Sequence, residues 1–75
     1  MKDFMKERVE DYISGDIMFI EEEISNNRAT TSELDDLYYL KHLTDEKIEN
    51  IVNKLLSDYE LENKINELIH YYLFH

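Results

Sequence analysis

The chain has 75 residues, no cysteine, no proline and a single glycine, and its formal net charge at pH 7 is −10. A chain of this length forms one domain, 1–75, and buries only about 60% of the surface that its unfolded form exposes. The absence of cysteine excludes disulfides and thiolate metal sites, and one glycine is too few for a glycine-rich phosphate-binding loop.

The negative charge is concentrated in the first half of the chain. Residues 1–36 hold eleven acidic and four basic side chains, a net charge of −7, and the remainder carries −3. Such a field repels phosphate backbones and anionic lipids and attracts a basic surface, so we expect no direct nucleic-acid or membrane binding. No stretch approaches about 18 consecutive apolar residues, and no apolar run follows the first lysine. The sequence therefore predicts a cytoplasmic protein.

Apolar residues recur at gaps of three and four across the first predicted helix, Met1–Ile24. The periodicity passes through Gly15, so we expect one helix that is weakened or bent there, because glycine costs about 1 kcal/mol relative to alanine. Phe4 and Met18 lie off the apolar stripe, and we expect them to be exposed or to face a partner. The opposite side presents a row of carboxylates, hereafter the acidic row: Asp3, Glu7, Glu10, Asp11, Glu21 and Glu22.

A capping box predicts where the second helix begins. Thr30 precedes Glu33 by three residues, so the hydroxyl and the carboxylate can each bind an amide that the first turn leaves unpaired. We expect this helix to span Thr31–Leu43. Thr44 is the N-cap candidate of a third helix, whose apolar stripe continues to Tyr59.

Beyond Tyr59 the apolar stripe rotates by more than half a turn, which a single straight helix cannot bury on one side. We therefore predict a short break at Ser57–Asp58, a second capping box formed by Ser57 and Glu60, and a fourth helix from about Asp58 to Phe74. No stretch shows the two-residue alternation of a half-buried strand. The predicted fold is all-α, a small bundle of four helices joined by short turns, or three helices if the last two merge.

Candidate catalytic and metal-binding groups are few. Glu67 and His70 have the Glu-x-x-His spacing of di-iron bundles, but such a site needs a second pair and two more glutamates. His42, His70 and His75 would form a ligand set only if the fold gathered them, and zinc sites often add sulfur, which this chain lacks. We therefore expect that the protein is not an enzyme, that it has no catalytic residue, and that it binds no metal and no cofactor.

Two features indicate an interaction surface. The acidic row is either a solvated face or a surface for a basic partner, in which carboxylates stand in for phosphates. The second feature is tyrosine, of which there are six. The doublets at 38–39 and 71–72 each place one ring near the surface, and tyrosine is a favoured interface anchor. We assign Tyr39 and Tyr71 to the partner-binding set together with the acidic row.

In size, acidity, lack of cysteine and richness in Asn, Ile and Lys, the chain resembles small proteins carried by bacteriophages and mobile elements of AT-rich bacteria. Many such proteins inhibit a host enzyme, and some inhibit CRISPR effectors. This resemblance implies an inhibitor, anti-CRISPR-like and acting by nucleic-acid mimicry in the host cytoplasm, that binds a basic, nucleic-acid-handling protein. The alternative hypothesis is a self-associating structural protein, a homo-oligomer, or an antitoxin-type partner.

Overall fold

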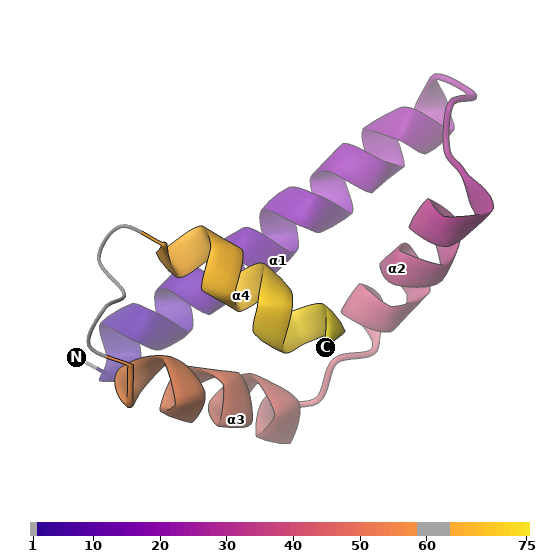
Figure 1. The fold of residues 1–75 in the computed structure, drawn as a ribbon. Helices are drawn as coiled ribbons and strands as arrows, with labels where there is room; N and C mark the ends of the chain where they lie inside the picture. Colours follow the sequence, from indigo (N-terminus) through magenta and orange to yellow (C-terminus); the bar gives the residue numbers. More distant parts are fainter. Residues whose placement is uncertain (1, 59–63) are drawn as a thin grey trace.

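The computed structural model describes residues 2–58 and 64–75, and in these residues it contains four α-helices and no β-strand (Figure 1). The predicted all-α fold is therefore confirmed. The helices are α1 (Lys2–Ser25), α2 (Thr31–Lys41), α3 (Asp45–Leu56) and α4 (Ile65–Phe74). In Figure 1, α1 is the longest helix, with α3 beside its N-terminal half, α2 beside its C-terminal half and α4 crossing it.

α1 is a single helix that continues through Gly15. Its 24 residues span about 36 Å. Gly15 has no positive φ, its position is exposed, and a Cβ atom added there would meet no atom within 4 Å. Nothing in the described residues therefore requires a glycine at this position, and the predicted continuity of the first helix is confirmed.

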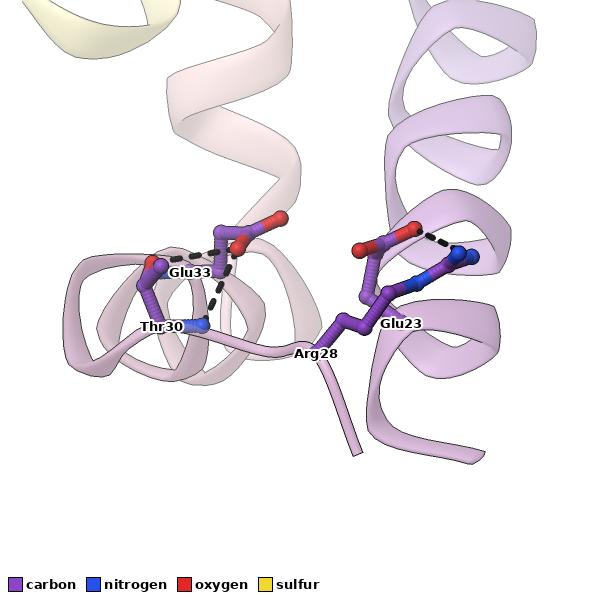
Figure 2. A network of polar contacts seen from close by, with 4 residues as sticks. All are labelled: Glu23, Arg28, Thr30 and Glu33. Atoms are coloured by element: carbon purple, nitrogen blue, oxygen red, sulfur yellow. Dashed lines mark hydrogen bonds and ion pairs between the residues drawn. The ribbon is translucent and has the colours of Figure 1, made fainter. Parts of the chain in front are cut away.

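The end of α1 is closed by an asparagine in the left-handed conformation. Asn27 has φ 56°, and the Arg28 amide donates to the carbonyl of Glu23 at 2.8 Å. This six-to-one bond is characteristic of the Schellman motif, which pairs carbonyls that the last turn would leave free. The Arg28 guanidinium also lies 3.3 Å from the Glu23 carboxylate, as Figure 2 shows. Backbone and side chain together direct the chain away from α1.

The predicted capping box at the start of α2 is present (Figure 2). The Glu33 amide donates to the Thr30 hydroxyl at 3.1 Å, and the Thr30 amide donates to the Glu33 carboxylate at 3.0 Å. Thr44 caps α3 as predicted, accepting from the Lys47 amide at 3.1 Å. Both helix starts therefore follow from hydrogen bonds within four residues of sequence.

The predicted start of the fourth helix at Asp58 is wrong. α3 ends at Leu56, Ser57 is its C-cap, and the Ser57 hydroxyl donates to the carbonyl of Lys54 at 2.8 Å. Asp58 is not helical, and α4 begins only at Ile65. Ser57 thus closes one helix rather than opening the next. The predicted Ser57–Glu60 box and the apolar position at Tyr59 depend on residues outside the described ranges.

The buried core draws on all four helices and, in the described residues, contains only apolar side chains. α1 packs against each of the other three helices, and α3 packs against α4. A rim ion pair between Lys2 and Glu49, at 3.1 Å, joins the start of α1 to α3. The core side chains are Met5, Val9, Ile13, Ile20, Leu40, Ile51, Val52, Leu55, Ile69 and Leu73.

Candidate interaction surface

The acidic row lies on the side of α1 that faces away from the core, and all six of its side chains are exposed. Of these six carboxylates, only Glu21 has a cationic partner within residues 2–58 and 64–75, the Lys41 ammonium at 3.3 Å. The other five carboxylates have no hydrogen bond or ion pair in that part of the chain. Because ions screen exposed charges over about 8 Å at physiological ionic strength, such a row acts on partners at short range.

Two apolar side chains interrupt the acidic row. Phe4 is 58% exposed and Met18 is 70% exposed, in agreement with the prediction that both point outward. They lie with Asp11 on one line of the helix, because successive members are seven residues apart, which is nearly two turns. Phe19 lies beside the apolar stripe and widens it, yet its side chain is also 58% exposed. The outward side of α1 is therefore acidic and apolar at once.

The two tyrosines assigned to the partner-binding set differ in their surroundings. Tyr71 is 55% exposed, and its ring stacks on that of His75 at 4.8 Å. Tyr39 is half-buried: its hydroxyl donates to the Leu73 carbonyl, and burial raises the pKa of this hydroxyl. In the doublet at 38–39 it is Tyr38 that lies at the surface. The choice of Tyr39 as the outward ring of this doublet is therefore wrong, because Tyr39 packs against the end of α4 and Tyr38 is the exposed ring.

A polar cluster that the sequence did not indicate joins α1 to α4. The Tyr12 hydroxyl lies 3.1 Å from Nδ1 of His70. Burial raises the pKa of Tyr12, and the nearby Asp16 carboxylate raises it further. Burial likewise raises the pKa of the Asp16 carboxyl; His70 opposes this shift and Asp36 adds to it. Tyr12 and His70 are 58 positions apart in the sequence, so no local sequence pattern reveals their contact.

Replacing Asp16 with asparagine is expected to raise the melting temperature at pH 7. Because the pKa of Asp16 is raised in the folded state, that state binds the proton more tightly than the unfolded chain does. Folding stability therefore falls as pH rises from the ordinary value of 3.8 through the raised pKa. The advantage of the variant should disappear as pH is lowered towards 3.8 in a series of thermal melts.

The exposed Asp11 is the matched control for this prediction. Asp11→Asn removes the same charge from the same helix and accounts for the general effect of net charge. If Asp16→Asn lowers the melting temperature at pH 7, attraction between Asp16 and His70 outweighs the cost of burying the carboxylate, and the prediction is wrong.

Glu67 and His70, the pair with di-iron spacing, are both exposed on α4. The His70 ring contacts Tyr12 and lies 4.9 Å from the ring of Phe74. Across 2–58 and 64–75, no group of three or more His, Asp or Glu side chains is arranged to hold a metal ion. Where the chain is described, no helix has the length and apolar character needed to cross a membrane.

The fold and the surface define a small all-α protein whose longest helix presents an acidic and apolar outward side. No protein family, curated protein or solved structure matches this chain.

Proposed function

We propose that this protein is a non-enzymatic inhibitor that docks the outward side of α1 on a basic, nucleic-acid-handling protein. It would act by occupying the groove that otherwise holds nucleic acid. One observation carries this proposal: six exposed carboxylates lie along one helix, and five of them have no cationic partner within the described residues. An origin in a phage or mobile element, with a CRISPR effector as one class of target, rests on composition alone.

The geometry of the row supports mimicry of a phosphate backbone. Asp3, Glu7 and Glu10 follow one another at three- and four-residue spacing, which places roughly one carboxylate per helical turn of about 5.4 Å. One strand of DNA carries a phosphate for each rise of about 3.4 Å. From Asp3 to Glu10 the two charge densities are comparable within a factor of two, and a gap of about 15 Å without a member of the row follows between Asp11 and Glu21. Phe4 and Met18 would add apolar contact that a phosphate backbone cannot provide.

The test is capture of the partner and measurement of its affinity. Immobilised protein is exposed to a lysate of the organism that encodes it, and retained proteins are identified and then titrated as purified proteins. We expect a basic protein whose binding weakens at high salt and competes with double-stranded DNA or RNA. Reversing Glu7, Glu10 and Glu22 to lysine should weaken binding by at least about tenfold, mainly through slower association.

The matched control reverses three exposed acids on other helices, Asp45, Glu46 and Glu67, and so changes the net charge by the same amount. Both variants must keep the helical circular dichroism of the parent. Equal loss in the two variants would mean that only net charge matters, and an unchanged affinity in the first would reject the acidic row as the binding surface.

Exposed rings away from the acidic row favour the second candidate function, self-association or an antitoxin-type pairing. Tyr38 is 69% exposed on α2, and Phe19 is exposed on α1. Large exposed apolar side chains are found where proteins contact one another. Sedimentation equilibrium tests the first form of this candidate, because a strict monomer in dilute solution excludes self-association.

A further inference from the structure

A shallow groove separates the middle of α2 from the C-terminal end of α4. It is largely open to solvent, with a volume of about 450 Å³, and it brings two carboxylates from α2 close to aromatic and aliphatic side chains from α4. α2 and α4 both pack against the core-facing side of α1, so the groove lies apart from the acidic row. Its lining residues are Asp35, Asp36, Tyr39, Leu73, Phe74 and His75.

The aromatic part of the groove is held in place by contacts within the protein. The Tyr39 hydroxyl donates to the Leu73 carbonyl, so the ring is anchored at both ends. Its centroid lies 5.7 Å from that of Phe74, and the ring centroid of His70 lies 4.9 Å from that of Phe74. These rings are therefore ordered before a ligand binds, so binding would cost little conformational entropy in the groove.

The groove has an excess of negative charge. Asp35 is exposed and Asp36 is half-buried, and in the described part of the chain neither carboxylate has a hydrogen bond or an ion pair. The charge of Asp36 also contributes, after burial, to the raised pKa of the half-buried Asp16 carboxyl. A cation in the groove would relieve this repulsion between like charges, whereas an anion would increase it.

We propose that this groove is a subsite for an arginine side chain presented by a partner protein. A guanidinium group can stack on the rings of Tyr39 or Phe74 while its N–H groups bind the Asp36 carboxylate. Its planar fork suits this combination better than the compact ammonium of lysine. The identity of the partner rests on the proposed function, but the affinity of the groove for a guanidinium group does not.

Nuclear magnetic resonance titration of the full chain with N-acetyl-arginine methylamide tests the proposal. Saturable shifts are expected at the backbone amides of residues 35–39 and 73–75. The citrulline analogue has nearly the same shape but no charge, and it should bind at least about fivefold more weakly. The lysine analogue should fall between the two. Equal binding of arginine and citrulline, or shifts spread over all acidic residues without saturation, would overturn the proposal.

Asp36→Asn is the decisive variant, and it should weaken arginine binding by about fivefold. It also removes the repulsion on Asp16, so it is expected to fold. Glu10→Gln removes the same charge from the acidic row and should leave the titration unchanged. Equal weakening by both variants would reduce the effect to net charge and reject the subsite.

The two proposals fail separately. If the groove does not bind arginine but the lysine reversals on α1 abolish partner capture, the subsite is wrong and the proposed function stands. If the groove binds arginine but those reversals leave capture unchanged, the subsite stands and the proposed docking surface is wrong.

Discussion

Replacing Leu55 with alanine is expected to lower the free energy of unfolding by about 2–5 kcal/mol. Leu55 lies on α3 and is 0% exposed, in the core formed by all four helices. The substitution loses the buried methyl groups and leaves a cavity that the neighbouring helices cannot fully close. Domains as a rule have roughly 5–15 kcal/mol of stability, and a short chain falls towards the lower end. Leu55→Ala should therefore lose much of its folded population, measured by urea denaturation followed by circular dichroism.

Leu34→Ala is the matched control, because it makes the same chemical change at a position on α2 that is 46% exposed. Its effect should stay within about 0.5 kcal/mol. Equal losses from the two substitutions would mean that Leu34 is buried in solution, as it would be in a self-associated form, or that Leu55 is not in the core.

Replacing Gly15 with alanine is expected to raise the free energy of unfolding by about 1 kcal/mol. Alanine has less backbone freedom to lose on folding, and its Cβ atom would enter open space. For a domain of this size, that gain raises the melting temperature by about 4–8 °C. A thermal melt of each protein at the same concentration measures the difference.

The neighbouring exposed position supplies the control for Gly15. Ser14→Ala improves helix propensity by less than Gly15→Ala does. Its gain in the free energy of unfolding should therefore be about half as large. Destabilisation by Gly15→Ala would show that α1 is interrupted at this position in solution, because only a residue with positive φ penalises a Cβ atom in an open space.

The acidic row shows how much of the candidate surface could be predicted. A period of 3.6 residues decides which side of an amphipathic helix faces solvent, so the exposure of Asp3, Glu10 and Met18 followed from α1 alone. The same reasoning fails for Tyr38 and Tyr39. Adjacent residues on a helix point about 100° apart, and α2 is apolar over most of its circumference, so the exposed ring depends on where α4 packs.

The position of α4 accounts for the other features of the structure that the sequence did not predict. Its crossing of α1 brings His70 to Tyr12, across 58 residues of sequence, and its last turn brings Leu73 and Phe74 to Tyr39. The polar cluster at Asp16 and the groove at Asp36 are consequences of these contacts. Neither has a signature in residue spacing, because each joins side chains from separate helices.

The sequence by itself determined the all-α class, the caps at Thr30 and Thr44, the continuity of α1 and the outward direction of the acidic row. Each of these depends on hydrogen bonds or periodicity within a few residues, which neighbouring helices do not alter. Only the tertiary structure decided where α4 begins and which tyrosine of a doublet is buried. These outcomes depend on how helices cross, and helix crossing is set by the packing of side chains that are distant in sequence.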